Sequence, residues 1–153
     1  MTSADEDFVH YVDCIDSLNR AWSILKELGG FERPSAVQGA AFLFALVEYA
    51  KPYTRSDGYH GRRKLPPPEL PESLALHEQI LDLRNQVLAH SDLTVKQAQL
   101  CLHSFQGKPH YIVSSNVAHS FPSRKAVMRL IEQTLEQMYL KRDQLLHALN
   151  AKT

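Results

Sequence analysis

The sequence predicts a mainly helical fold, a four-helix bundle with a small β-hairpin inserted before the last helix. Four segments repeat hydrophobic residues every three or four positions, as amphipathic helices do. One short region instead has β-favouring residues on both sides of a glycine turn. The chain has 153 residues, 44% of them hydrophobic, which is enough to bury one core without disulfides or metals. We therefore expect residues 1–153 to form a single domain.

The first two helices are predicted before residue 52. The first covers Asp5 to Leu28, and Gly29-Gly30 ends it. The second follows Pro34, where Ser35 can cap it, and runs to about Ala50. Small and large apolar residues fill nearly every face of this second helix, so we expect it to be the most enclosed of the four. The seam of the first helix consists of Phe8, Tyr11, Ile15, Leu18, Trp22 and Leu25.

The second half of the chain predicts a connection, a helix, a hairpin and a last helix. Tyr53 to Pro71 has turn residues and three consecutive prolines but no period, and predicts an ordered or semi-rigid connection. Helices are predicted from about Glu72 to Ala89 and from about Ser123 to Leu149. Between them, β-favouring runs flank Phe105-Gln106-Gly107-Lys108-Pro109 and predict the hairpin. The inner side of the last helix is predicted to carry Val127, Met128, Ile131, Leu135, Met138, Leu145 and Leu149.

Composition excludes several functional classes. The 17 Lys and Arg residues balance 17 Asp and Glu residues, so nucleic acid could bind only at a local basic cluster. The longest apolar stretch, Gly39 to Val47, is less than half the ~20 residues that a membrane span needs, and the N-terminus is acidic where a signal peptide is basic. We expect a cytoplasmic protein without membrane contact. Cys14 and Cys101 lack CxxC spacing and are expected to be reduced and buried.

The third predicted helix has an unusually wide apolar face. At 100° per residue its Leu, Ile and Val residues spread over roughly 200°, more than one core contact needs, which predicts a second contact such as a partner chain. Arg84 and His77 project into this arc, where an unpaired guanidinium would be costly. Either an acidic residue of the first helix, such as Asp13 or Asp16, neutralises Arg84, or Arg84 binds a phosphate through its planar fork.

His90 follows Arg84 at the predicted end of the same helix, which favours the protonated imidazole. On a straight helix the two side chains would point about 120° apart, with an offset of ~9 Å. Either the backbone leaves helical geometry at His90, or a two-fold axis brings two copies together. Arginine and histidine occur at similar spacing at Arg55/His60 and Arg142/His147. Arg84 differs because it lies on an apolar helix face.

The run LRNQVLAHSD, residues 83–92, resembles the Arg-polar-x(3 to 5)-His signature of the HEPN superfamily, and in particular its abortive-infection type. The order of the four helices is similar to that family over most of the chain. The resemblance implies a homodimeric, metal-independent RNA endonuclease of a toxin–antitoxin or phage-defence system, without a cofactor, whose further partner is an antitoxin protein. It implies Arg84, Asn85 and His90 as the catalytic residues of a composite site.

The implied mechanism uses the 2′-OH of RNA as the nucleophile. His90 would accept its proton, Arg84 would stabilise the charge on phosphorus, and Asn85 would bind a phosphate oxygen or orient His90. Some relatives carry a tyrosine two residues after the histidine, where this chain has Asp92. Other relatives have lost cleavage and bind a nucleotide or a protein, and this non-catalytic module is the alternative.

Two other groups of residues are candidate sites. Arg55, Arg62, Arg63 and Lys64, interleaved with aromatic residues, suit the phosphates and bases of RNA, although a solvated surface loop would have the same composition. His103, His110 and His119 surround the predicted hairpin, and two of them could face each other across its strands. Because no cysteine or acidic cluster accompanies them at ligand spacing, we expect no metal site.

Overall fold

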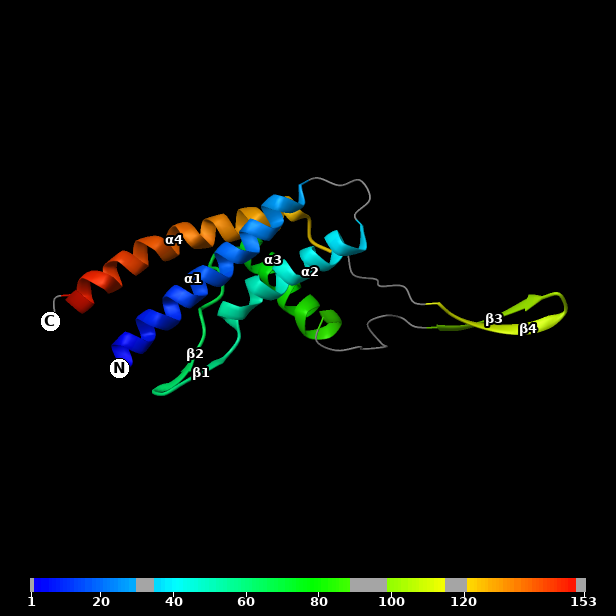
Figure 1. Cartoon of the computed structure of the whole chain (residues 1–153), viewed down its shortest axis with the longest axis horizontal. Coiled ribbons are helices and arrows are strands. Elements are labelled where there is room, and N and C mark those ends of the chain that lie inside the picture. Colours follow the sequence, from blue (N-terminus) through cyan, green and yellow to red (C-terminus); the bar gives the residue numbers. More distant parts are fainter. Residues whose placement is uncertain (1, 30–34, 89–98, 115–120, 151–153) are drawn as a thin grey trace.

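The computed structural model describes residues 2–29, 35–88, 99–114 and 121–150. In these ranges the chain forms four α-helices and two small antiparallel hairpins (Figure 1). The mainly helical fold class is therefore confirmed, whereas its HEPN-like arrangement stays a prediction. The helices are α1 (Ser3–Leu28), α2 (Ala36–Ala50), α3 (Pro71–Asp82) and α4 (Arg124–Asn150). No helix in the described ranges has the length and hydropathy needed to cross a membrane.

Side-chain caps fix the starts of the first two helices. Ser35 Oγ accepts a hydrogen bond from the Gln38 N–H, and the Gln38 side chain accepts one from the Ser35 N–H, so the predicted cap is confirmed as a capping box. Thr2 and Asp5 form the same box before α1. α1 therefore begins at Ser3, two residues before the predicted start at Asp5. Gly29 ends it with a φ of 63°.

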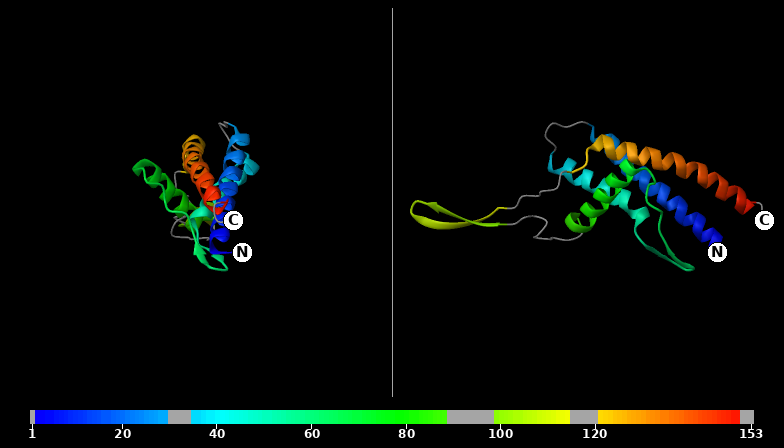
Figure 2. Two further views of the ribbon diagram at one scale, coloured as in Figure 1. Left: turned by 90° about the vertical axis from the view of Figure 1, so that its left-hand side faces the viewer. Right: turned by 180° about the vertical axis from the view of Figure 1, so that it is seen from behind.

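The core lies where α1 packs against α2 and α4, with α1 and α4 side by side along much of their length (Figures 1 and 2). Most of the predicted seam of α1 is buried there, while Trp22 and Phe8 are only partly buried. Six of the seven residues predicted for the inner side of α4 also face the core, all but Leu149, and Leu130 joins them. Cys14 is buried with a free thiol as expected, but Cys101 is only half-buried. The buried seam consists of Tyr11, Ile15, Leu18, Leu25, Val127, Ile131, Leu135 and Met138.

The expectation that α2 is the most enclosed helix is wrong for its first half. Leu46 and Tyr49 in the second half are fully buried. Val37 at its start and Phe44 just past its middle are 77% and 52% exposed. The physical reason is that no described element covers the outer side of this first half, so that its apolar side chains face solvent.

The connection between α2 and α3 is more regular than predicted. It begins with the 3₁₀ turn η1 (Lys51–Tyr53) and continues as strands β1 (Ser56–Gly58) and β2 (Gly61–Arg63), which pair antiparallel around a two-residue turn, Tyr59-His60. Strands of three residues are too short to show an alternating pattern, so no periodicity predicts them. The three prolines then lead into α3.

The predicted second hairpin is confirmed. β3 (Gln99–Phe105) and β4 (Lys108–Ser114) pair antiparallel around Gln106-Gly107. Both turn residues have positive φ, 51° and 73°, as a type I′ turn requires, and Gly107 adopts this conformation without steric cost. The hairpin extends away from the helices (Figures 1 and 2).

The third helix departs from the predicted range of Glu72 to Ala89. α3 is α-helical from Pro71 to Asp82, and residues Leu83–Leu88 then form a π-helix, η2. Ala89 lies outside the described residues. The predicted signature begins in this altered segment.

Candidate functional site

Arg84 and Asn85 lie at the point where the third helix changes its winding. In a π-helix each N–H binds the carbonyl five residues earlier. Such turns are rare in proteins, and those that occur are frequently found at functional sites. The first six residues of the HEPN-like signature, LRNQVL, make up η2. The unusual backbone and the first two predicted catalytic residues therefore coincide. Projection of a straight α-helix could not have shown this.

The two side chains contact each other. Nη1 of Arg84 donates a 2.8 Å hydrogen bond to Oδ1 of Asn85. Arg84 is partly exposed and Asn85 is exposed. Among the described residues no acceptor is bonded to Nε or Nη2, so this edge of the guanidinium can present its donors to a planar anion. His90, the third predicted catalytic residue, lies outside the described residues, so the structure brings together two of the three.

The acidic residues suggested as internal partners of Arg84 do not meet it. In the described part of the chain, no ion pair joins Arg84 to Asp13 or Asp16. The reason is the packing of the helices: η2 contacts α2, whereas α1 contacts α2 and α4. The helical projection places Arg84 on the buried apolar face. In the structure Arg84 is partly exposed, whereas the neighbouring Leu83 is buried.

His77, the other polar residue in the apolar arc, is buried away from Arg84. Its Nδ1 lies 2.9 Å from the hydroxyl of Tyr49, and its ring meets that of Tyr53 edge-on with 4.4 Å between centroids. Burial lowers the pKa of His77, which favours the neutral ring. The hydroxyl of Tyr49 can then donate to the unprotonated Nδ1. His77 is therefore a core histidine whose Nδ1 is paired with a buried hydroxyl.

Two of the four predicted RNA-binding cations have acidic partners within the subunit. Arg62 Nε lies 2.8 Å from Oδ1 of Asp57 across the β1–β2 ladder. Arg63 Nε lies 2.6 Å from Oδ1 of Asp7, and its Nη1 lies 3.4 Å from Oε1 of Glu6. These contacts reduce the positive charge that this hairpin offers to a phosphate.

The other two cations, Arg55 and Lys64, flank the hairpin and are exposed. Neither forms an ion pair within the ranges that the structure describes. Of the four predicted RNA-binding cations, two therefore have no acidic partner among the described residues. Its role in RNA binding stays a prediction.

A carboxylate that the sequence did not single out anchors this hairpin. Glu6, which is 7% exposed, accepts hydrogen bonds from the N–H groups of Tyr59 and His60 at 2.6 and 3.0 Å, and its Oε2 lies 2.6 Å from Nδ1 of His60. Desolvation acts to raise the pKa of Glu6, but the bonds from His60 and Tyr59 and the charge of Arg63 outweigh it and lower that pKa. An acidic residue in the first turn of a helix ordinarily complements the helix dipole, so sequence offered no sign of this role.

Two cavities formed by described residues lie near these elements, and Arg84 lines neither of them. One of about 650 Å³ lies between the β1–β2 hairpin and α1. Three carboxylates line it, Glu6, Asp13 and Asp57, against one guanidinium, that of Arg63. This excess of negative charge disfavours a phosphate there.

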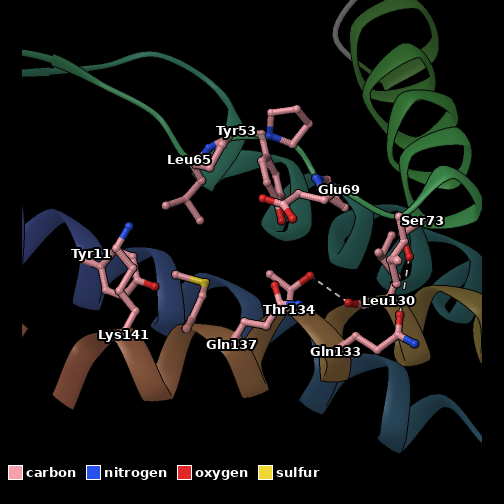
Figure 3. A pocket seen from close by; sticks show the side chains of 15 residues that line it. Tyr11, Tyr53, Leu65, Glu69, Ser73, Leu130, Gln133, Thr134, Gln137 and Lys141 are labelled. Atoms are coloured by element: carbon pink, nitrogen blue, oxygen red, sulfur yellow. Dashed lines mark hydrogen bonds between the residues drawn. The ribbon is translucent and has the colours of Figure 1, made fainter. Parts of the chain in front are cut away.

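The other cavity is a groove of about 460 Å³ between the proline segment and α4 (Figure 3). Tyr11 and Tyr53 form part of its walls, and Gln137 and Lys141 of α4 reach its edge. The ammonium of Lys141 lies 5.7 Å from the centroid of the Tyr11 ring. The groove is mixed in polarity, and none of the predicted site residues lines it.

No metal site is built from the residues that the structure describes, because they contain no group of three or more His, Cys, Asp or Glu able to hold an ion. His103 and His110 do lie opposite each other in the β3–β4 register. His119 lies outside the described residues. Two histidines on an exposed ribbon do not make up the four ligands of a structural zinc site.

Comparison with known proteins adds no family to these observations. No family model, no curated protein and no solved structure matches this chain.

Proposed function

We propose that this protein is a metal-independent RNA endonuclease of the HEPN type, which acts as a homodimer in a toxin–antitoxin or phage-defence system. The observation that carries the proposal is the Arg84–Asn85 pair in η2. The guanidinium is partly exposed, a neutral amide holds one of its nitrogens, and no carboxylate pairs with it among the described residues. Such a group suits the recognition of a phosphate.

The chemistry follows from what each group can do. The Nε–Nη2 edge of Arg84 would bind two phosphate oxygens and stabilise the charge that develops when the 2′-OH of RNA attacks phosphorus. Asn85 would fix the plane of the guanidinium through the hydrogen bond to Nη1. His90 would take the proton of the 2′-OH as a general base. In a homodimer, the His90 of the other copy, or a water, would protonate the leaving 5′ oxygen.

The direct test is cleavage of a single-stranded RNA by the purified protein in excess chelator, with DNA of the same sequence as a second substrate. We expect RNA to be cut and DNA to stay intact, because deoxyribose lacks the attacking hydroxyl. Arg84→Ala should lower the cleavage rate by about 10²- to 10³-fold. His90→Ala should lower it by about 10²- to 10⁴-fold.

The chain offers a matched control for these variants. Arg142 and His147 on α4 have a similar spacing, but Arg142 already binds Asp143 at 2.8 Å and lies over the ring of Tyr139. Arg142→Ala should leave cleavage unchanged. Loss of activity on chelation, or full activity in His90→Ala, would contradict the proposal. RNA that is bound through Arg84 but never cut would favour the non-catalytic binding module instead.

A further inference from the structure

The β3–β4 hairpin carries an exposed apolar face. Leu102 lies opposite Tyr111 in the strand register, and Leu100 lies on the same side of β3 because side chains alternate along a strand. These three side chains are 68% (Leu100), 63% (Leu102) and 68% (Tyr111) exposed. Phe105 and Ile112 lie on the opposite face, and with them the hairpin carries five of the thirteen large hydrophobic side chains that are exposed in the described residues. No charged residue occurs from Gln99 to Phe105.

Nothing in the described part of the subunit covers this face. The two strands pair with each other, and the ribbon extends away from the helices (Figures 1 and 2). A two-stranded ribbon alone is marginally stable in water and gains independent stability when it packs against a helix or further strands. The hairpin therefore needs a surface to pack on.

The exposed side of α2, from Val37 to Phe44, presents a surface of matching character. Val37 and Phe44 lie seven residues apart on one side of the helix, and Ala40 between them is also exposed. No charged residue occurs from Ser35 to Val47. A helix that faces water ordinarily carries charged or polar residues on that side. The depletion of charge on both surfaces is typical of the centre of a protein interface.

We propose that two copies of the chain associate about a two-fold axis by exchanging these hairpins, so that β3–β4 of each copy lies across the exposed side of α2 in the other. This proposal rests on the proposed function, which requires two copies of the chain, and adds how the two copies associate. Because η2 packs against α2, the exchanged hairpin would lie on the helix that supports the partner's η2.

The area of contact favours a reciprocal exchange over a single docked hairpin. A seven-residue strand is ~24 Å long and a two-stranded ribbon is ~10 Å wide, so one face covers roughly 240 Å². One docked hairpin would bury about 480 Å² over both partners, well below the ~1,000 Å² of a specific interface. Two reciprocal contacts bury about 960 Å², before the protruding side chains are counted. A second copy of this chain therefore fits the surface better than a partner that takes one hairpin.

The first test measures oligomeric state by light scattering over a range of concentrations. We expect a dimer for the unaltered chain, and at least about a 100-fold rise in the dissociation constant for Leu102→Asp and for Val37→Asp. His103→Asp places the same charge on the opposite face of β3, and Val9→Asp places it on an exposed site of α1; both should stay dimeric. Neither Leu102 nor Val37 belongs to the buried core, and circular dichroism should confirm intact helices in each variant. A monomeric unaltered chain, or a dimeric Leu102→Asp variant, would overturn the proposal.

The second test identifies the covered surface by disulfide cross-linking. All chains carry Cys101→Ser, while Cys14 can stay because it is buried. One chain then carries Leu102→Cys and a tagged chain carries Val37→Cys, and the two are mixed. Oxidation should join the tagged chain to the untagged one. If only a chain with both substitutions cross-links, and does so within itself, the hairpin folds onto its own α2 and the exchange is overturned.

The exchange and the nuclease can fail separately. If Leu102→Asp is dimeric and cuts RNA, the exchange is wrong and the proposed function stands. If Leu102→Asp is monomeric but the unaltered dimer does not cut RNA, the exchange stands and the proposed function is wrong.

Discussion

Glu6 and His60 join the first turn of α1 to the tip of the β1–β2 hairpin, with 2.6 Å between Oε2 of Glu6 and Nδ1 of His60. The same carboxylate accepts the N–H groups of Tyr59 and His60, which form the turn of the hairpin. The hairpin also carries Arg62 and Arg63, two of the predicted RNA-binding cations. This buried carboxylate therefore ties the hairpin that carries these cations to α1.

Replacement of Glu6 by Gln should release the hairpin from α1. A neutral amide has one acceptor oxygen where the carboxylate has two, and it forms no charge-assisted bond with His60 or Arg63. We expect faster hydrogen exchange at the amides of Tyr59 and His60, with the amides of α4 unaffected. Glu136→Gln, an exposed site on α4, is the control and should leave exchange in the hairpin unchanged. Equal protection of the two turn amides in Glu6→Gln and the unaltered protein would contradict this role.

Acid should have the same effect as this substitution. The pKa of Glu6 is lowered in the folded state, so its ionised form stabilises the fold above the ordinary carboxylate range, and this contribution is lost as the pH falls through the lowered pKa. The difference in unfolding free energy between the unaltered protein and Glu6→Gln should therefore shrink to zero in acid. Urea unfolding of both proteins from neutral to acid pH measures it. A difference that persists at low pH would mean that the charge of Glu6 is not what stabilises the hairpin.

Gly58 should not tolerate a larger residue. A Cβ atom at this position would lie 2.1 Å from Oε1 of Glu6 and 2.8 Å from Nη1 of Arg63. We expect Gly58→Ala to displace the Glu6 carboxylate and to increase exchange of the Tyr59 and His60 amides. Gly39→Ala is the matched control, because its Cβ would meet nothing within 4 Å and lies in a helix, where alanine should stabilise by about 0.5–1 kcal/mol. Unchanged protection of the turn in Gly58→Ala would show that the carboxylate can move without cost.

Elements defined by neighbouring residues could be predicted from the sequence. Ser35 caps α2 through Gln38, three residues away, and Gln106-Gly107 supplies the turn of β3–β4 from its own conformational preferences. The seams of α1 and α4 follow from spacing alone. In each case the chemistry that determines the element lies within a few residues of it.

Features that depend on distant contacts could not be predicted. The β1–β2 turn is held by Glu6, 53 residues before Tyr59. The exposed first half of α2 depends on which elements cover it, and its composition alone indicates burial. The candidate site could be predicted only in part. The residue types of Arg84 and Asn85 identify the motif, but the π-helical winding and the contact between the two side chains depend on packing.

Glu48 should contribute more to stability than either of its cationic partners. It is 1% exposed and binds Nε of Arg20 at 3.1 Å and the ammonium of Lys51, whereas the side chains of both cations are about half exposed. Loss of the Glu48 carboxylate removes both ion pairs, whereas loss of one cation leaves the carboxylate paired with the other cation. We expect Glu48→Ala to lower the free energy of unfolding by about 1–3 kcal/mol. Arg20→Ala and Lys51→Ala should each cost less than about 1 kcal/mol.

Urea unfolding at neutral pH measures all three values. The exposed pair of Arg62 and Asp57 serves as a control, because an ion pair in water contributes little, and Arg62→Ala should change stability by less than about 0.5 kcal/mol. If Arg20→Ala costs as much as Glu48→Ala, the two cations are not interchangeable and the carboxylate depends on the one from α1.

His77 should make the fold less stable below neutral pH. Burial lowers its pKa, so the folded state binds its proton less readily than the unfolded chain does. The contribution of the neutral ring is fully present above the ordinary histidine pKa of about 6.5 and is lost as the pH falls toward the lowered pKa of the folded state. Protonation would also remove the acceptor that faces the Tyr49 hydroxyl. Between about pH 7 and about pH 5, stability should fall by at most about 1.4 kcal/mol per pH unit on account of this one group.

The comparison of His77→Gln with the unaltered protein isolates this effect. Glutamine has an amide that can still meet the hydroxyl of Tyr49 but takes up no proton in this range, so the variant should show a flatter dependence of unfolding free energy on pH. His147→Gln, an exposed site near the end of α4, is the control and should keep the slope of the unaltered protein. An equal slope in His77→Gln would contradict the assignment, because the loss of stability in acid would then come from groups other than this buried imidazole.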